Sequence, residues 1–573
     1  MRLLTLLLLS ITLAAGAQDY QTLFEKSKGT QTPDYAAIIS FYKKLDKASP
    51  KLFLKEMGMS DSGFPLHLAL FSNDAKFDPA KWHIQHKTVL LINNGIHPGE
   101  PDGIDACMSL IRDLVTGKKT LPDNIALAII PVYNIGGCLN RSVNYRVDQN
   151  GPEAFGFRGN AQNLDLNRDF IKCDSKEARS FTQLFHLVDP DIFVDNHVSD
   201  GADYQHIMTL ITSQHDKLGG QMGSYLNKTF EPALYQSMKS KGYDLVPYVN
   251  FFGETPDNGW PEFFDSPRYS SGYATLWNCF GFTTETHMLK PFDQRVKSTY
   301  ALMQSFIDFA TDNADSIQSL RRLTKQNVQT ATSFPIRWKV DNAQYSDVIF
   351  KGYEAGRKTS EVSGLPRLFY DRNKSFEKKI KFYNTYTVTT SVQKPVAYII
   401  PQGWWKVTDL LRLNKVTMRR LPKDTAIEVE VYQVTDYKTT ARQYEMHHPN
   451  SDATVTTVKQ KYSFRKGDYY IPMNQEANRF LTEVLEPQSN DSYFAWNFFD
   501  AILGQKEGYS DYMFEDKAAQ FLKSHPGIKS KLDERRIQDT AFAKDGRAQL
   551  DFVFKNSPYF EPDYLRYPVF RVM

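Results

Sequence analysis

A short segment at residues 88–100, TVLLINNGIHPGE, decides the fold class. Its first seven residues, Thr88 to Asn94, are an apolar run that ends in asparagines, which is typical of a buried strand followed by a turn. Two side chains able to bind a metal, His97 and Glu100, come next. The stretch from Gly103 to Leu114 then has its apolar residues at helical spacing. The segment therefore predicts one strand, one loop and one helix of a layered α/β domain.

The same pattern recurs along the first half of the chain. Further buried strands are predicted at Ile125–Val132, at Asp191–His197 after a helix over Lys176–Val188, and at Gly281–Glu285. Strands that alternate with helices predict a mainly parallel sheet, and ligands bind at the carboxyl ends of such strands. Three candidate functional side chains lie at or just beyond these strand ends: His97, His197 and Glu285.

The chain is too long for one domain and is nearly neutral. It has 573 residues, and single cores rarely grow beyond about 300 residues. We expect a first domain over residues 18–325, which contains these candidate side chains, and one or two accessory domains over residues 331–573. Runs rich in β-branched residues, such as Tyr386–Val392 and Ile427–Val434, predict many strands in this second part. A net charge of +3 gives no electrostatic reason to expect nucleic acid or a membrane surface as a partner.

The N-terminus has the features of a secretory signal peptide. Residues 1–17 combine a positive charge at Arg2, a short apolar core and small residues up to Ala17. We expect cleavage after Ala17 and a secreted or periplasmic protein, with no later segment long and apolar enough to span a membrane. Export permits disulfides, but the sequence does not decide between disulfide pairs and buried free thiols for its four cysteines: Cys107, Cys138, Cys173 and Cys279.

Metal-binding residue types come at the spacing that a zinc site needs. Catalytic zinc takes three protein ligands of nitrogen, oxygen or sulfur type and keeps one position open. His97 and Glu100 lie three residues apart in a predicted turn and can reach one ion, and His197 ends a predicted strand. Glu285 ends another buried strand, where a carboxylate needs a charged partner or a function. Each residue alone has an ordinary structural explanation, so the hypothesis depends on the set.

An Asn–Arg pair completes the set. Arg168 offers a planar fork that matches a carboxylate bidentately, and core packing gives no reason for Asn167-Arg168 at this point. In chain order, the motifs resemble the pattern of the M14 zinc carboxypeptidases: His97-x-x-Glu100, Asn167-Arg168, His197 and Glu285. The resemblance covers about residues 30–320. It implies an α/β/α sandwich on an eight-stranded mixed sheet, one Zn²⁺ ion held by the two histidines and Glu100, and a peptide substrate with a free C-terminus.

The resemblance also implies a role for each remaining residue. Glu285 would take a proton from water and deliver it to the leaving amine. Arg158 would stabilise the developing oxyanion, while Asn167 and Arg168 would bind the terminal carboxylate of the substrate. Asp165 would orient a zinc-binding histidine from behind.

The side-chain pocket is expected near two tyrosines. A mobile tyrosine caps the substrate in this family, and Tyr269 and Tyr273 are the candidates in this chain. No charged residue separates Tyr269 from Glu285, which argues against a pocket for strongly basic or acidic terminal side chains.

Two other functions remain open on these residues. The same zinc site would serve an amidase or deacylase that acts on small acyl-amino acids or murein stem peptides. A non-catalytic binding protein would use the domain as a platform for the C-terminal half. Histidines outside the set are predicted to be surface or loop residues rather than metal ligands: His83, His86, His447 and His448.

Overall fold

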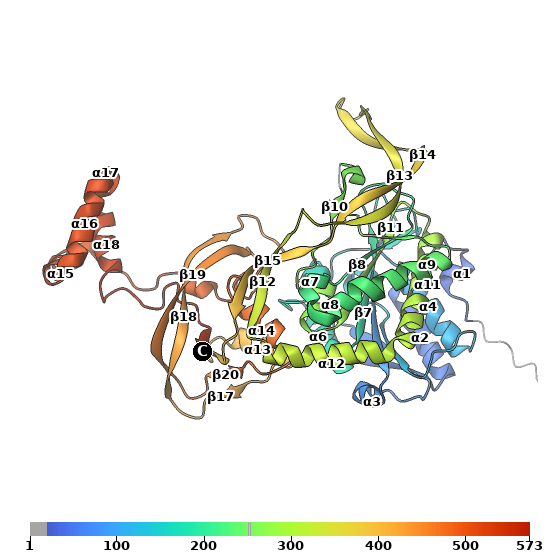
Figure 1. Ribbon diagram of the computed structural model, residues 1–573, viewed down its shortest axis with the longest axis horizontal. Coiled ribbons are helices and arrows are strands. Elements are labelled where there is room, and N and C mark those ends of the chain that lie inside the picture. Colours follow the sequence, from blue (N-terminus) through green and yellow to red (C-terminus); the bar gives the residue numbers. More distant parts are fainter. Residues whose placement is uncertain (1–19, 250, 252–253) are drawn as a thin grey trace, which may run out of the picture.

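The computed structural model describes residues 20–249, 251 and 254–573 (Figure 1). The predicted signal peptide at residues 1–17 lies outside the described residues. Within the described part, no helix combines the length and the apolar character needed to cross a membrane.

An eight-stranded mixed sheet forms the centre of the N-terminal half (Figure 1). Its strands, in spatial order, are β1 (Leu52–Met59), β2 (Pro65–Phe71), β4 (Ile125–Ile130), β3 (Thr88–Asn94), β7 (Ile192–Ser199), β11 (Phe280–His287), β8 (Met208–Thr212) and β9 (Leu245–Pro247). The four central strands, from β4 to β11, are parallel to one another, and the other neighbours include antiparallel pairs. The predicted α/β fold class with a mixed eight-stranded sheet is therefore confirmed.

Helices cover both faces of this sheet. On one face, alternate side chains of the strands pack against four helices: α2 (Tyr35–Ala48), α4 (Asp102–Val115), α9 (Glu231–Ser240) and α11 (Phe292–Asp312). On the other face lie α6 (Lys176–Val188) and α10 (Ser270–Leu276). Because both faces are buried, the central strands read as continuous apolar runs rather than as alternating ones.

The core on the α6 face continues into the C-terminal half. It includes side chains of α13 (Trp405–Leu413) and α14 (Asn478–Leu485) as well as those of α6 and α10. Trp277, just after α10, stacks on Phe480 of α14 with ring centroids 5.2 Å apart. The two halves therefore share one apolar core at this face.

A long helix, α12 (Ala314–Thr330), leads out of the N-terminal half (Figure 1). Its Arg321 is 4% exposed and donates to the Asp191 carboxylate at 3.1 Å and to the Asp189 carboxylate. Lys325, one turn later, lies 3.1 Å from Asp189 and 3.0 Å from Glu476 of the C-terminal half. Ion pairs thus fix the helix to the loop before β7.

The C-terminal half is rich in strands, as predicted. A six-stranded sheet contains, in spatial order, β17 (Arg419–Arg420), β20 (Tyr469–Pro472), β16 (Ala397–Ile400), β21 (Phe570–Val572), β18 (Thr425–Thr439) and β19 (Asn450–Phe464). Two smaller pairings are β12 (Ser333–Val340) with β15 (Tyr386–Gln393), and the long hairpin β13 (Ser346–Thr359) with β14 (Pro366–Tyr383), which also pairs with β10 (Trp260–Pro261).

The sequence did not indicate a helical unit that projects from this half (Figure 1). It consists of α15 (Asp511–Ser524), α16 (Pro526–Gln538), α17 (Thr540–Ala543) and α18 (Gly546–Lys555), which share a small apolar core of their own. The chain segments that lead to it and from it come together, because the Lys506 amide donates to the Glu561 carboxylate at 2.6 Å.

The structure decides between disulfide pairs and buried free thiols, which the sequence left open. Cys107, Cys138, Cys173 and Cys279 are all buried and free. Burial raises the pKa of each thiol, for example that of Cys107 to about 12, so these thiols are small core residues rather than reactive groups.

Candidate metal centre and active site

Three predicted ligands meet at the carboxyl edge of the central strands. His97 and Glu100 lie in the loop between β3 and α4, and His197 lies in β7, the strand next to β3. Their ligand atoms are all within 4.8 Å of one another, and each residue is at most 4% exposed. Among the described residues, these are the only histidine, cysteine and acidic side chains grouped in this way.

Each histidine contacts a second carboxylate with its outer nitrogen. His97 Nε2 lies 2.9 Å from Asp165 Oδ1, and His197 Nε2 lies 3.0 Å from Asp195 Oδ2. Such contacts fix the tautomer, because the Nε2–H donates to the carboxylate and leaves Nδ1 with its lone pair free. Burial opposes the ionised form of Asp165, but His97 and Arg158 outweigh it and hold the pKa of Asp165 well below its usual value.

The inner nitrogens fit a bound cation. His97 Nδ1 lies 3.3 Å from Glu100 Oε1, and His197 Nδ1 lies 3.2 Å from Glu100 Oε2. With Nε2 protonated, two nitrogen lone pairs face a carboxylate, and these like partial charges repel unless a positive charge lies between them. In the described structure, the buried His97 Nδ1 has no hydrogen-bond partner. Two nitrogens and one carboxylate with an open side form a donor set that suits zinc.

Glu285 lies directly beside His197. The two residues are register partners on the parallel strands β11 and β7, so their side chains point to the same face of the sheet. Burial raises the pKa of Glu285 to about 8, and Glu100 and Asp200 add to this effect, while His197 and Arg158 oppose it. A divalent cation at the triad would lower this pKa by Coulomb attraction, which returns the carboxylate to a form that accepts a proton.

Two arginines surround Glu100. The predicted Arg158 places Nη1 3.5 Å from Glu100 Oε1 and donates from Nε to Asp165 at 3.0 Å. Its side chain is 44% exposed, so part of the guanidinium faces the pocket. Arg146, which the sequence did not single out, donates to Glu100 Oε1 at 2.8 Å.

The predicted carboxylate-binding pair lies in the same pocket, which has a volume of about 550 Å³. Asn167 and Arg168 belong to a short 3₁₀ turn that Asp165 caps by accepting from the Asn167 amide at 2.9 Å. The Asn167 side-chain oxygen is buried without a hydrogen-bond partner in the described structure. The Arg168 guanidinium lies over the ring of Tyr269, 4.6 Å from its centroid, which keeps its planar fork in one orientation.

The two predicted tyrosines have different places. Tyr269 lines the pocket. Tyr273 does not: it is fully buried in the core on the α6 face, and its hydroxyl donates to Asn414 at 2.7 Å. The prediction that Tyr273 binds substrate is therefore corrected, because one turn of α10 carries it from the pocket into the core.

The sequence analysis did not identify several other residues of the site. Tyr248, which follows β9, and Asp200, which follows β7, both line the pocket. Asp195 precedes His197 by two residues on one strand, so period-two alternation was a signal that would have identified it. Tyr248 and Arg146 lie in loops, where no periodicity marks a functional side chain.

The rest of the pocket wall carries no charge. The uncharged residues that line it include Ile211 of β8, Ser270 and Ser271 of α10, and Thr283 of β11. The absence of charged residues between Tyr269 and Glu285 in the sequence thus corresponds to an uncharged surface in this pocket.

The C-terminal half touches the site from two directions. The Glu445 carboxylate accepts from the backbone amide of Asp165 at 2.9 Å. Asp491 accepts from both the amide and the side chain of Arg268, the residue before Tyr269, at 3.0 and 2.8 Å. His447 contacts Asp174 at 2.9 Å, so the segment around Glu445 is a docking loop of the accessory half.

Comparisons with known proteins agree with this site. A family model described as zinc carboxypeptidase, Peptidase_M14, matches residues 38–209, a range that includes the triad, Arg158, Asn167 and Arg168. The chain is 22% identical to a carboxypeptidase 2 of Trichophyton tonsurans over 500 residues, which cover 79% of this chain and 84% of that protein. It is 22% identical to a carboxypeptidase 2 of Trichophyton rubrum over 519 residues, 84% of this chain and 87% of that protein.

Solved structures of similar proteins include two carboxypeptidases. A carboxypeptidase A from Helicoverpa armigera is 15% identical, with a TM-score of 0.38, over 50% of this chain and 75% of that one. A metallo-carboxypeptidase from Burkholderia cenocepacia is 16% identical, with a TM-score of 0.35, over 48% and 68% of the two chains. The family match and the relatives, which align over most of both chains, support an M14 zinc carboxypeptidase, which is a zinc hydrolase.

Proposed function

We propose that this enzyme removes single residues from the free C-termini of peptides, using one zinc ion held by His97, Glu100 and His197. The observation that carries the proposal is one pocket that contains both this triad with Glu285 and the pair Asn167 and Arg168. The first group suits hydrolysis, and the second suits a terminal carboxylate.

The proposal gives each residue of the site a defined role. A zinc ion bound at the triad would supply Lewis acidity, which lowers the pKa of a bound water and polarises a carbonyl group. Glu285 accepts the proton of the attacking water and transfers it to the nitrogen of the leaving amine. Arg158, whose guanidinium is partly exposed to the pocket, donates hydrogen bonds to the oxygen that gains negative charge.

Other residues of the pocket would orient the substrate. Arg168 would form a bidentate ion pair with the terminal carboxylate, and the Asn167 amide would donate to the same group. Tyr269 and Tyr248, which line the pocket, would cover the bound terminus. The uncharged wall of Ile211, Ser270, Ser271 and Thr283 supports a preference for uncharged terminal side chains.

The amino-terminal segment supports export of the enzyme. Residues 1–17 have the composition of a signal peptide. We therefore propose that the substrates are peptides outside the cytoplasm.

Mass spectrometry of a mixed peptide panel tests the proposal. Each peptide is supplied with a free and with an amidated C-terminus and is incubated with zinc-loaded protein. We expect stepwise loss of single C-terminal residues from the free forms only, fastest for uncharged residues. Internal cleavage, or equal cleavage of the amidated forms, would contradict a carboxypeptidase that recognises the terminal carboxylate.

A further inference from the structure

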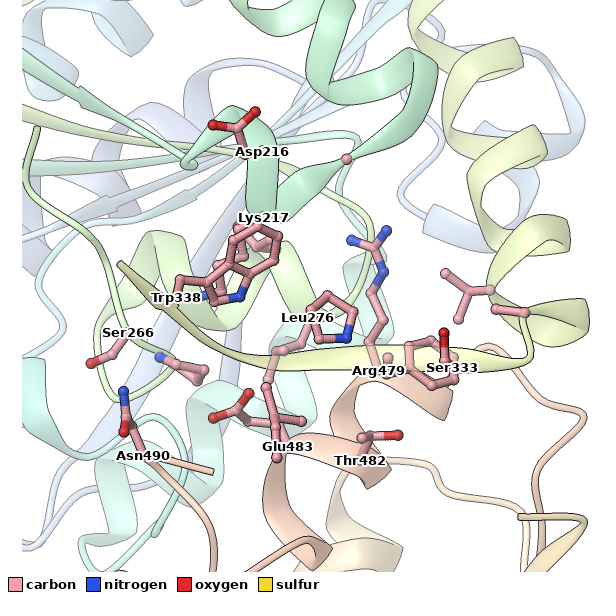
Figure 2. Close-up of a pocket in the computed structure, with 18 of the residues that line it drawn as sticks. Asp216, Lys217, Ser266, Leu276, Ser333, Trp338, Arg479, Thr482, Glu483 and Asn490 are labelled. Atoms are coloured by element: carbon pink, nitrogen blue, oxygen red, sulfur yellow. The ribbon is translucent and has the colours of Figure 1, made fainter. Parts of the chain in front are cut away.

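A second pocket lies between the two halves of the chain (Figure 2). It has a volume of about 290 Å³ and shares no lining residue with the pocket that contains the triad. The catalytic half contributes the start of α7 (His215–Leu218), the segment around Ser266 and the end of α10. The C-terminal half contributes β12 and α14.

Two charged side chains of α14 face this pocket without an ion-pair partner. Glu483 is only 8% exposed, and among the described residues no lysine, arginine or histidine nitrogen lies within 4.0 Å of its carboxylate. Arg479 donates from Nη2 to the Leu218 carbonyl at 2.8 Å, but its buried Nη1 has no partner in the described structure. Uncompensated buried charges cost several kcal/mol, which makes such a pair unusual in a cavity without a ligand.

The electrostatic environment agrees with the geometry. Burial raises the pKa of Glu483 to about 7, and only the more distant Lys217 and Arg268 and one backbone amide oppose this effect. Burial alone lowers the pKa of Arg479 to about 10. Burial therefore destabilises the charged form of each group, and an opposite charge nearby would stabilise it.

The other two charged residues of the pocket, Lys217 and Asp216, also have hydrogen bonds to backbone groups. Lys217 Nζ donates to the Asp265 carbonyl at 2.7 Å. Asp216 accepts from the Tyr386 amide at 2.8 Å. The pocket thus presents charges of both signs rather than a patch of a single sign.

The spacing of these two groups selects the length of a ligand. Glu483 follows Arg479 by four residues on α14, which separates their Cα atoms by about 6 Å along the helix axis. Figure 2 shows the two side chains diverging from the helix, so their charged groups face different parts of the pocket. A separation of about 6 Å corresponds to about two residues of extended peptide, at about 3.3–3.6 Å per residue.

We propose that this pocket binds a short peptide with both termini free, of dipeptide length. Its ammonium group pairs with Glu483 and its carboxylate with Arg479. Apolar side chains of the ligand pack against the apolar residues that line the pocket, which include Phe334, Ile336, Trp338 and Leu276. The proposal is independent of the reaction at the triad.

Isothermal titration calorimetry with L-alanyl-L-leucine tests the proposal. The full chain carries Glu285→Gln to prevent turnover, and the probes are the free dipeptide, its N-acetyl form and its C-terminal amide. We expect the free dipeptide to bind and each blocked form to bind at least about tenfold more weakly, since each loses one charge-assisted contact of 1.5–3 kcal/mol. These comparisons use an unaltered pocket, so they do not depend on the folding of a pocket variant.

Two pocket variants assign the contacts. Glu483→Gln is expected to bind the free and N-acetylated peptides equally, and Arg479→Gln to bind the free and amidated peptides equally. The added change Arg168→Met, which weakens the carboxylate grip proposed for the triad pocket, should leave this binding unchanged. The proposal is overturned if the free dipeptide shows no binding at millimolar concentration, if acetylation has no effect, or if Arg168→Met abolishes the signal.

Discussion

The carboxylates behind the histidines define the metal centre as much as the ligands do. Asp165 and Asp195 lie 2.9 and 3.0 Å from the outer nitrogens of His97 and His197. They orient the rings, select the tautomer in which the lone pair of Nδ1 faces the metal site, and make each Nδ1 a stronger metal ligand. Of these two residues the sequence argument identified only Asp165, because it belongs to the motif that surrounds Arg168.

Removing either negative charge should weaken zinc binding while the ligands stay in place. We expect Asp165→Asn and Asp195→Asn each to lower zinc affinity about 10- to 100-fold, the usual effect of losing such a partner. Competition with a chromogenic chelator measures this affinity. Asp200→Asn is the matched control, because Asp200 lines the same pocket and has no hydrogen bond to either histidine in the described structure. An unchanged affinity in both variants would show that the contacts have no influence on the metal.

Arg168 is expected to govern recognition of the substrate terminus. Arg168→Met should reduce kcat/KM for peptides with a free C-terminus about 10- to 100-fold, since a charge-assisted hydrogen bond contributes 1.5–3 kcal/mol. Steady-state kinetics on peptides with a free C-terminus measure the effect, since the amidated peptides are expected to stay uncleaved. Arg168→Lys, which keeps the charge but lacks the fork, should be intermediate. An undiminished kcat/KM in Arg168→Met would contradict a role for Arg168 in binding the substrate terminus.

The helix α12 depends on its ion pairs with the loop before β7. Asp189, at the C-terminal end of α6, contacts Arg321 and Lys325 of this helix. Burial opposes ionisation of Asp189, but these two cations outweigh it and lower the pKa below its usual value. The pairs therefore contribute stability that is fully present above the unfolded-state pKa of about 3.9 and is lost as pH falls through the folded-state value.

This linkage gives a prediction for acid stability. Asp189→Asn should lower the melting temperature near pH 7, and the difference from the unmodified protein should narrow steadily below about pH 4. Asn tolerates the left-handed backbone of this position, where φ is +47°, so the substitution itself adds little strain. Thermal unfolding followed by circular dichroism from pH 3 to pH 7 measures both curves. A difference that stays constant over this range would exclude the proposed ion-pair contribution.

The central elements were predictable because each combines two signals. The strands β3, β4, β7 and β11 are continuous apolar runs bounded by turn residues, and α6 and α4 have clear helical spacing. The long hairpin β13–β14 is largely exposed and rich in lysine and arginine, so no apolar alternation marked it. Tyr273 was misplaced for a related reason, since the sequence did not show that α10 begins at Ser270 and turns it away from the pocket.

The two halves of the chain form one structure rather than two independent units. They share the core on the α6 face, and Glu445 and Asp491 of the C-terminal half bind the segments that carry Asp165 and Tyr269. The proposed boundary between residues 325 and 331 lies at the end of α12, where the chain passes into this shared region. The accessory half therefore shapes the site as well as covering the sheet.

Truncation tests this dependence. A chain that ends at residue 330 would expose the apolar face that includes Trp277 and Phe185, and we expect it to aggregate or to bind a hydrophobic dye. The matched control deletes the projecting helices by joining Lys506 to Glu561, whose hydrogen bond shows that the ends are adjacent, through a short glycine linker. This control should stay soluble and keep its activity. A soluble, fully active chain ending at residue 330 would contradict the shared core.

The most direct test of the central claim is the turnover number of Glu285→Gln at a measured zinc content. The substitution keeps the shape of the side chain and removes its capacity to accept a proton. The account predicts about one zinc ion per chain, as in the unmodified enzyme, and a kcat on free C-termini lower by a factor of about 10² to 10⁴. Undiminished turnover in the zinc-loaded variant would contradict the account, because Glu285 would then not be the group that moves the proton.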